Sequence, residues 1–271
     1  MWRRNRKEKN RYLEVAISAA KEAGRIQMIH FGQSHSIEYK GDFNPVTAVD
    51  RRCDKVIQRI LLNAFPEHEV MTEESPFETK GSPWRWIIDP IDGTTNYLHG
   101  FPCFSVSIGL EVEGELRLGV VYVPPLGELF HAEKGNGAFL NGKPISVSRE
   151  SVLARSLLST GFPYDVHEHS DFYLRYFHEF IKQSFAVRRP GSAAIDLCYV
   201  AAGRFDGFWE FKLQPWDLAA GVLMITEAGG RVTDFNGQPF SIYAKETLAS
   251  NGLIHEQMLQ VIQEIGAETG R

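Results

Sequence analysis

Two aspartates stand three residues apart at the end of an apolar run. They are Asp89 and Asp92, within the sequence WIIDPIDGTTN at residues 86–96. The two isoleucines before Asp89 are typical of a strand interior, and Pro90 is expected to end the strand because it has no N–H to donate to a ladder. Gly93 then predicts a tight turn that leads into a short helix.

This arrangement suits metal-assisted phosphoryl chemistry. Acids just past a buried strand can hold a cation, and the start of a helix points free backbone N–H groups at an anion. A phosphate ester repels nucleophiles until a cation neutralises it, so the two features together indicate phosphoryl transfer. The alternative is that both acids only cap a turn. The remaining motifs of the chain favour the metal site.

Four further segments carry chemistry-bearing residues in a fixed order. They are Lys40 with residues 44–50 (NPVTAVD), residues 71–75 (MTEES), residues 191–194 (GSAA), and Glu210 with residues 215–217 (PWD). Together with residues 86–96 they resemble the inositol monophosphatase family, the lithium-sensitive, Mg²⁺-dependent phosphatases, and in particular its bacterial-type members. The resemblance runs from about Tyr12 to Gly230 without a missing motif.

The resemblance implies that two or three Mg²⁺ ions bind in each subunit. The first ion is expected at Glu73, Asp89 and the backbone carbonyl of Ile91, and the second at Asp89, Asp92 and Asp217. Mg²⁺ prefers carboxylate, carbonyl and water oxygens as ligands. Two such ions about 4 Å apart can activate a water and stabilise the alkoxide that leaves.

The resemblance also implies a catalytic set of Asp50, Thr94 and Glu73. Asp50 and the Thr94 hydroxyl would orient and deprotonate the attacking water, and Glu73 would contribute as a metal ligand. As an isolated residue, Asp50 stands where the N-cap of a helix would stand, and capping is compatible with catalysis. Asp217 has the same ambiguity at another helix start. The residues alone do not distinguish Glu73 from Glu74, and only the family's Glu-Glu-Ser motif selects the first.

By resemblance, nine residues bind the substrate. The phosphate is expected on the N–H groups of Gly93 and Thr94, and the carboxylate of Glu210 is expected to accept hydrogen bonds from the hydroxyls of a polyol. For Gly191 the alternative is a turn before a helix. The full set is Ile91, Asp92, Gly93, Thr94, Gly191, Ser192, Ala193, Glu210 and Asp217.

Three cations are further candidates for substrate contact: Lys40, Arg189 and Lys212. Lys212 departs from the animal members of the family, which tend to carry glycine there. Its ammonium could pair with Glu210 or meet a second phosphate. The alternative for each of these cations is a solvated surface charge.

The leading hypothesis is Mg²⁺-dependent hydrolysis of a small phosphomonoester, with inositol 1-phosphate as the first candidate. Members of the resembled family also hydrolyse fructose 1,6-bisphosphate or histidinol phosphate, and the residues exclude neither. A hypothesis of another class is an additional binding role with RNA polymerase in ribosomal RNA transcription, as some bacterial relatives have. The family implies a homodimer.

The composition is that of an ordinary soluble protein of 271 residues, 43% of them apolar. No apolar stretch could span a bilayer. The basic start, residues 1–11, lacks the apolar core of a secretion signal, so we expect a cytoplasmic location. A formal net charge of −5 argues against nucleic-acid binding, except through this basic arm. Three scattered cysteines indicate neither a disulfide framework nor a zinc site.

Hydrophobic spacing predicts the elements that position these residues. One amphipathic helix ends near Phe31, and a second follows Asp50 and ends before Pro66. Short β-like runs with Gly-rich turns predict an antiparallel sheet, with strands at 104–110, 118–123, 129–132 and 138–140. Strands and helices then alternate, which predicts a largely parallel sheet. The strands are expected at 157–159, 185–187 and 205–209, and the helices at 171–181, 192–202, 217–227 and 254–265.

We therefore expect a mixed α/β (α+β) fold. The layered αβαβα sandwich of the resembled family, with one mainly antiparallel and one mainly parallel sheet, fits both halves. Residues 1–147 would form an N-terminal α+β lobe with most metal ligands. Residues 148–271 would form a C-terminal α/β lobe that completes the site within a single compact unit.

Overall fold

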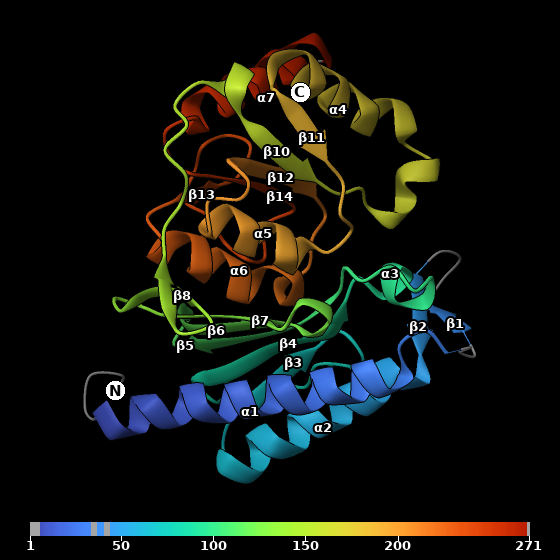
Figure 1. Ribbon diagram of the computed structural model, residues 1–271, viewed down its shortest axis with the longest axis vertical. Helices are drawn as coiled ribbons and strands as arrows, with labels where there is room; N and C mark the ends of the chain where they lie inside the picture. Colours follow the sequence, from blue (N-terminus) through green and yellow to red (C-terminus); the bar gives the residue numbers. More distant parts are fainter. Residues whose placement is uncertain (1–5, 34–36, 41–43, 270–271) are drawn as a thin grey trace.

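The computed structural model describes residues 6–33, 37–40 and 44–269. Its elements stack in five layers (Figure 1). A pair of helices is followed by a seven-stranded sheet, a middle pair of helices, a five-stranded sheet and another pair of helices. This is an αβαβα sandwich, so the predicted fold class is confirmed.

Helices α1 (Arg6–His30) and α2 (Ala48–Ala64) form the first layer. Both were predicted from the spacing of their apolar residues. Alanines along one face of α1 are fully buried, and their small side chains let the helix pack closely within the core that it shares with the first sheet. A two-stranded ribbon, β1 (Ile37–Lys40) and β2 (Asn44–Thr47), joins the two helices.

The seven-stranded sheet has the strand order β3-β4-β5-β6-β7-β8-β9. Strands β3 and β4 are parallel, and the neighbouring strands from β4 to β9 are antiparallel, as predicted. The strands are β3 (Glu69–Thr72), β4 (Trp84–Asp92), β5 (Ser105–Val112), β6 (Glu115–Val123), β7 (Glu128–Glu133), β8 (Gly137–Leu140) and β9 (Lys143–Ile145).

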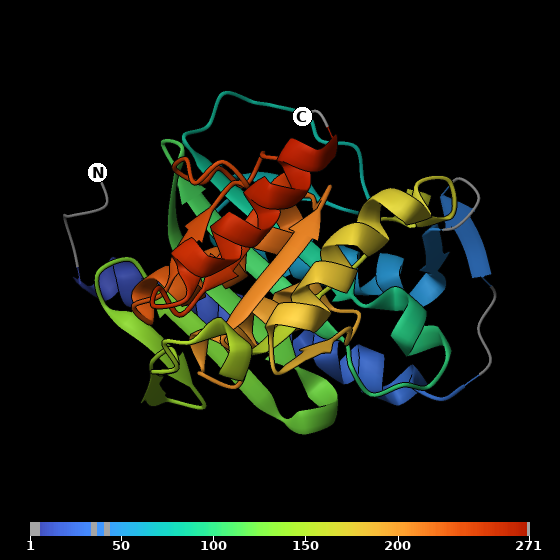
Figure 2. The ribbon, with the colours of Figure 1, turned by 90° about the horizontal axis from the view of Figure 1, so that it is seen from above.

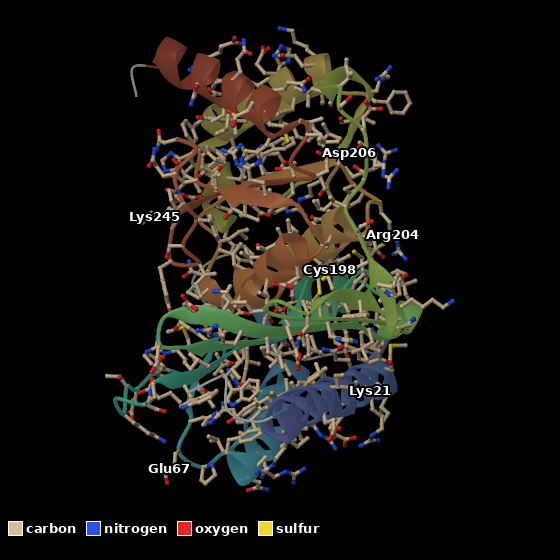
Figure 3. All side chains as sticks on the ribbon, turned by 90° about the vertical axis from the view of Figure 1, so that its left-hand side faces the viewer. Lys21, Glu67, Cys198, Arg204, Asp206 and Lys245 are labelled. Atoms are coloured by element: carbon tan, nitrogen blue, oxygen red, sulfur yellow. The ribbon has the colours of Figure 1, made fainter. Side chains whose placement is uncertain are left out.

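Helices α5 (Ala193–Ala201) and α6 (Pro215–Glu227) fill the space between the two sheets. Two glycines of the first sheet let α6 approach closely. A Cβ at Gly109 would lie 2.6 Å from the Cβ of Ala219, and one at Gly119 would lie 2.8 Å from the carbonyl oxygen of Ala220. Cys198 of α5 lies buried in this middle layer, as a small apolar residue would (Figure 3).

The five-stranded sheet has the order β11-β10-β12-β14-β13. Strand β10 runs parallel to β11 and β12, as the alternation of strands and helices predicts. Strand β14 lies antiparallel between β12 and β13. The strands are β10 (Leu157–Thr160), β11 (Ala186–Arg188), β12 (Gly207–Phe211), β13 (Arg231–Thr233) and β14 (Glu246–Ser250). Short 3-10 turns are η1 (Pro124–Leu126), η2 (Leu153–Arg155) and η3 (Tyr164–His167).

Helices α4 (Ser170–Gln183) and α7 (His255–Thr269) cover the outer face of this sheet (Figure 2). Their buried residues join those of the strands in one hydrophobic cluster, to which α4 contributes aromatic rings and α7 contributes aliphatic side chains and a methionine. Within it, the rings of Phe180 and Trp209 stack with centroids 4.1 Å apart. Large rings bury much apolar area with few rotatable bonds, so this cluster fixes α4 on the sheet.

The strand that carries the paired aspartates does not end at Pro90, so that prediction is wrong. Strand β4 continues to Asp92, and its pairing with β5 shifts register between Asp89 and Asp92. Pro90 lies within this irregular stretch, where the ladder requires no N–H donor from it. Strands β1, β2, β3, β9, β13 and β14 were not predicted.

The segment 146–152 connects β9 with η2. The proposed lobe boundary near residue 147 falls in this segment, and the division into lobes stays a prediction. One buried cluster contains side chains of both the first sheet and helices α5 and α6. Among the described residues, no helix is both long and apolar enough to cross a membrane.

Candidate active site

The irregular end of β4 brings Asp89 and Asp92 to one side of the strand. In a regular strand, residues three apart point to opposite faces of the sheet. The register shift between the two aspartates removes this alternation, and ligand oxygens of Asp89, Asp92 and Asp217 all lie within 4.8 Å of one another. We call these three residues the acidic cluster. Asp217 comes from the first turn of α6, in the other half of the chain.

The acidic cluster is poorly hydrated and its charges repel. Burial raises the pKa of Asp89 well above its usual range, and the nearby carboxylates of Glu73, Asp92 and Asp217 raise it further. Burial, followed by the charge of Asp92, raises the pKa of Asp217 in the same way. Three such carboxylates at this spacing favour a bound cation, which would remove their mutual repulsion.

Asp92 is anchored to the second half of the chain. Its Oδ2 accepts hydrogen bonds from the Ser192 hydroxyl and from the backbone N–H of Ala194, at 2.8 Å for the latter. Burial raises the pKa of Asp92, and these hydrogen bonds act against that rise. The start of α5 thereby holds the orientation of a predicted metal ligand.

Asp50 and Thr94 form a hydrogen-bonded pair beside the acidic cluster. The Thr94 hydroxyl lies 3.1 Å from Oδ1 of Asp50 and 3.0 Å from the carbonyl oxygen of Ile91. The N-cap of α2 is Thr47, and Asp50 is the third residue of the helix, where its Oδ2 accepts from the Thr47 N–H at 2.9 Å. One carboxylate oxygen therefore caps the helix while the other faces Thr94.

The two neighbouring glutamates face different acids. Glu73 lines the cavity described below, and its charge raises the pKa of Asp89, after the larger effect of burial. Glu74 instead acts on Asp50: burial raises the pKa of Asp50 most, hydrogen bonds from Thr47 lower it, and the charge of Glu74 raises it. Glu73 is not among the three acids whose ligand oxygens lie within 4.8 Å of one another, so its assignment as a metal ligand stays a prediction.

A cavity of about 710 Å³ lies over the acidic cluster. Gly93 begins α3 (Thr94–Leu98) with φ of +96°, and a Cβ there would lie 2.9 Å from the carbonyl oxygen of Cys103. Only glycine accepts both constraints without strain. All nine predicted substrate residues line this cavity: Ile91, Asp92, Gly93, Thr94, Gly191, Ser192, Ala193, Glu210 and Asp217.

Glu210 lies on β12 and lines the cavity. Burial raises its pKa to about 8, while the guanidinium of Arg189 acts to lower it. Gly161 makes room for this carboxyl group, because a Cβ there would lie 2.2 Å from Oε1 of Glu210. A nearly buried carboxyl group in a polar cavity is suited to hydrogen bonding with hydroxyl groups of a ligand.

The remaining predicted cations have different positions. Arg189 is exposed and lines the cavity. Lys212 also lines it, but its ammonium donates a hydrogen bond to the carboxylate of Asp165. Lys40 ends strand β1, and its side chain lies outside the part of the chain that the structure describes, as does the N-terminal arm before Arg6.

Three residues of the site were missed by sequence reasoning. Asn96 donates to the carbonyl oxygens of Cys103 at 2.7 Å and Pro190 at 2.9 Å, and so fixes the loop before α5. Asp196 is 1% exposed and lines the cavity, and within the described part of the chain its Oδ1 has no hydrogen-bond partner. An acid within the apolar run AAIDLCYVA was a visible signal for Asp196. The third residue, Tyr164, also lines the cavity, and no feature of the sequence around it indicated this.

The chain is similar to characterised protein families and structures over almost its whole length. Residues 8–267 match the sequence model of the inositol monophosphatase family. A fructose-1,6-bisphosphatase/inositol-1-monophosphatase of Thermotoga maritima is 40% identical over 259 residues, covering 95% of this chain and 98% of the relative. The Nus factor SuhB of Pseudomonas aeruginosa is 41% identical over 258 residues, covering 93% and 95%.

A solved structure gives the same result for the fold. The extragenic suppressor protein suhB of Bartonella henselae superimposes with a TM-score of 0.89 at 40% sequence identity. The match covers 93% of this chain and 98% of that protein.

Proposed function

This chain belongs to the inositol monophosphatase family, and on that basis we propose that it hydrolyses a small phosphomonoester with Mg²⁺, preferring inositol 1-phosphate. The observation that carries the proposal is the acidic cluster, whose ligand oxygens lie within 4.8 Å of one another on the wall of a cavity. Phosphatase chemistry requires a cation at such a place, because the phosphate and the carboxylates are all negative.

The donor atoms fit Mg²⁺. Glu73, Asp89 and the carbonyl oxygen of Ile91 would hold one ion, and Asp89, Asp92 and Asp217 would hold another. All of these donors are oxygens, the ligand type that Mg²⁺ prefers. When bound, the ions neutralise the phosphate, promote ionisation of the attacking water and stabilise the alcohol oxygen that leaves.

Asp50 and Thr94 are proposed to handle the proton of the attacking water. The Thr94 hydroxyl can accept a hydrogen bond from the water while donating its own hydrogen to Oδ1 of Asp50, which lies 3.1 Å away. Oδ2 of Asp50 is held by the cap of α2 and keeps the carboxylate oriented. Burial raises the pKa of Asp50, which makes the carboxylate a better base than a solvated aspartate.

Two observations support a polyhydroxylated alcohol that carries one phosphate as the substrate. Glu210, on β12, offers a carboxyl group that can both donate to and accept from ring hydroxyls while it is protonated. Lys212, the candidate for a second phosphate, is engaged with Asp165. The name of the Thermotoga maritima relative supports fructose 1,6-bisphosphate as the second candidate substrate.

Phosphate release from a substrate panel tests this proposal. The panel is inositol 1-phosphate, fructose 1,6-bisphosphate and histidinol phosphate, each with Mg²⁺ and with a chelator. We expect release only with Mg²⁺ and the highest kcat/KM for inositol 1-phosphate. Mg²⁺-independent release would contradict the metal assignment. A higher kcat/KM for the bisphosphate would make a sugar bisphosphatase the better description.

We also propose an additional binding role in ribosomal RNA transcription, which the name of the Pseudomonas aeruginosa relative supports. Such a role would use surfaces away from the cavity, so it should survive loss of catalysis. The immobilised full chain should retain purified RNA polymerase, and the Asp92→Asn variant should retain it equally. Absence of retention by both proteins would contradict the binding role and leave the phosphatase proposal unaffected.

A further inference from the structure

One wall of the cavity is formed by the segment between β10 and α4. Residues 161–167, which we call the rim segment, all line the cavity and include the turn η3. The last residue of β12, Phe211, and the following residues 212–214 line it as well. Apart from the space that Gly161 leaves for Glu210, the rim segment has no part in the chemistry proposed above.

The rim segment is fastened by the carboxylate of Asp165. Its Oδ2 accepts a hydrogen bond from the ammonium of Lys212, and its Oδ1 accepts one from the Tyr173 hydroxyl at 3.0 Å. The ammonium also lies 5.8 Å from the centroid of the Tyr173 ring. The backbone N–H of Lys212 donates to the carbonyl oxygen of Lys245 at 2.6 Å. Asp165 is thus tied both to α4 and to the turn after β12.

Lys212 holds this position despite an unfavourable backbone conformation. Its φ is +58°, in the left-handed region that glycine adopts without steric cost and that a residue with a Cβ adopts only with strain. Strained residues of this kind gather at functional sites. The contact between the ammonium and Asp165 is the interaction that glycine could not make.

Tyr164 directly precedes Asp165 and lines the cavity that lies over the acidic cluster. It lines the cavity together with Asp89, Asp92 and Asp217. Burial raises the pKa of its hydroxyl, and the charges of Glu73 and the acidic cluster raise it further. The residue as a whole is 53% exposed, so its other atoms border the solvent. A phenol in this position can donate one hydrogen bond.

We propose that Tyr164 contacts the substrate phosphate and that Lys212 is the residue that positions it. Through Asp165, Lys212 holds the rim segment so that the Tyr164 hydroxyl donates a hydrogen bond to a phosphate oxygen bound over the acidic cluster. The inference rests on the proposed function only in placing a phosphate there. It is independent of which alcohol the phosphate esterifies.

Binding of inorganic phosphate, measured by calorimetry in the presence of Mg²⁺, tests the contact directly. Tyr164→Phe should weaken binding about tenfold, because it removes a hydrogen bond to a charged group. Lys212→Met should weaken binding about threefold, the effect of losing a solvent-exposed ion pair that orients the donor. In the Tyr164→Phe background, Lys212→Met should have no further effect, because the group that it positions is gone.

Two control variants separate positioning from general effects of charge and stability. Lys212→Arg keeps a cation for Asp165 and should restore most of the affinity. Lys182→Met removes a similar exposed lysine from an ion pair on α4, 3.1 Å from Glu179, and should leave phosphate binding unchanged. Equal losses from Lys212→Met in both backgrounds, or normal binding by Tyr164→Phe, would overturn the inference.

Turnover of three substrates, two with one phosphate and fructose 1,6-bisphosphate with two, distinguishes this inference from a role of Lys212 toward a second phosphate. Tyr164→Phe and Lys212→Met should each lower kcat/KM by the same factor for inositol 1-phosphate and for p-nitrophenyl phosphate, which share only the phosphate. A loss confined to fructose 1,6-bisphosphate would assign Lys212 to substrate contact and contradict the positioning role.

A measurement without metal or substrate completes the test. In the metal-free protein, Lys212→Met should speed amide hydrogen exchange in residues 161–167, whereas Tyr164→Phe should not. Unchanged exchange in Lys212→Met would show that the ion pair does not hold the rim segment. A wild-type protein that binds phosphate but fails these comparisons would refute only this inference, and one that binds no phosphate would refute the proposed function as well.

Discussion

Each carboxylate of the acidic cluster can be replaced by an amide of the same shape. Asp89→Asn, Asp92→Asn and Asp217→Asn each remove one charged oxygen donor from the proposed metal site, and the amide oxygen can still accept hydrogen bonds such as those from Ser192 and Ala194. We expect each variant to lose more than tenfold in kcat/KM, about 1.4 kcal/mol of transition-state stabilisation, with an unchanged circular dichroism spectrum. Wild-type turnover in any folded variant at saturating Mg²⁺ would contradict its assignment.

Glu73 and Glu74 are adjacent in the chain, so the same substitution at each residue provides a matched comparison. Glu73→Gln should lower turnover like the aspartate substitutions, because Glu73 lines the cavity and its charge acts on Asp89. Glu74→Gln should have a much smaller effect, since Glu74 is not among the residues that line the cavity. The reverse result would move the proposed metal ligand by one position.

Glu210 should make the stability of the metal-free protein depend on pH. Its pKa is raised by burial to about 8 in the folded protein, from an ordinary value of 4.5, so the folded state binds the proton more tightly than the unfolded state. Stability from this group is therefore complete below pH 4.5 and falls as the pH rises to about 8, by at most about 1.4 kcal/mol per pH unit.

Urea unfolding of the chelator-treated protein between pH 5 and 8 measures this dependence. Glu210→Gln should flatten the profile relative to the wild type. Glu179→Gln is the control, because hydrogen bonding to Lys182 lowers the pKa of Glu179, which is therefore charged throughout this range. Identical slopes in wild type and Glu210→Gln would show that Glu210 is ionised in the folded protein.

At the scale of elements, α6 depends on two glycines in the sheet beneath it. Gly109→Ala would place a Cβ 2.6 Å from that of Ala219, within a layer that has no spare volume. We expect a loss of about 1–3 kcal/mol in the free energy of unfolding, measured by denaturant titration. Turnover should fall as well, because α6 carries Asp217.

A helical glycine with open space around it provides the control for this substitution. Gly266 lies in α7, and a Cβ there would meet no atom within 4 Å. Gly266→Ala should leave stability unchanged or raise it by up to about 1 kcal/mol, because alanine favours a helix. Equal destabilisation by both substitutions would refute the account of close packing under α6.

The sequence predicted the elements whose apolar residues recur at a regular spacing. Helix α2 is one example, since its buried residues follow the helical period and Pro66 lies beyond its end. Strand β14 was missed because only one of its five residues is β-branched or aromatic, whereas the predicted β12, of the same length, has three aromatic residues. The buried run of β14 also lacks the alternation that marks a strand with one wet face. Pro90 was misjudged because the shifted register of β4 arises from pairing with β5.

For the site, the motifs located the residues that line the cavity but not those that hold them. Asp89, Asp92 and Glu210 belong to recognisable segments and all lie in the cavity wall. The space that Gly161 leaves for Glu210 and the hold of Lys212 on Asp165 join residues far apart in the chain. Such contacts form only when the two sheets pack together, and no local sequence pattern predicts them.

At the scale of the whole molecule, the acidic cluster joins the two halves of the chain. Asp89 and Asp92 come from β4, and Asp217 comes from α6. A cation that binds only the folded protein should therefore stabilise the entire molecule. At a Mg²⁺ concentration about 100 times Kd, the expected gain is about 2.7 kcal/mol, seen as a rise in Tm.

The Asp217→Asn variant is the control for this prediction. It should show a much smaller rise in Tm with Mg²⁺, while Glu74→Gln should respond like the wild type. An equal rise in all three proteins would show that Mg²⁺ stabilises the protein from another site.

Family membership also supports assembly into a homodimer, which we propose for this chain. Sedimentation equilibrium should give twice the chain mass of 30.6 kDa. Dilution to nanomolar concentration tests the strength of association, because a dimer with a large interface should persist there. A mass of one chain at micromolar concentration would contradict the proposal.

Asp50 and Asp217 each combine a proposed role in the reaction with the capping of a helix. This combination affects how such proteins change during evolution. Oδ2 of Asp50 caps α2 through Thr47, and Oδ2 of Asp217 caps α6 by accepting from the N–H of Gln214 at 2.7 Å. Each cap needs only an oxygen acceptor, and the amide oxygen of asparagine can accept the same hydrogen bond. Selection on folding alone therefore keeps an acceptor at both positions but not the negative charge. A distant relative with asparagine at either position is expected to keep the fold and to have lost the charge that the proposed reaction needs.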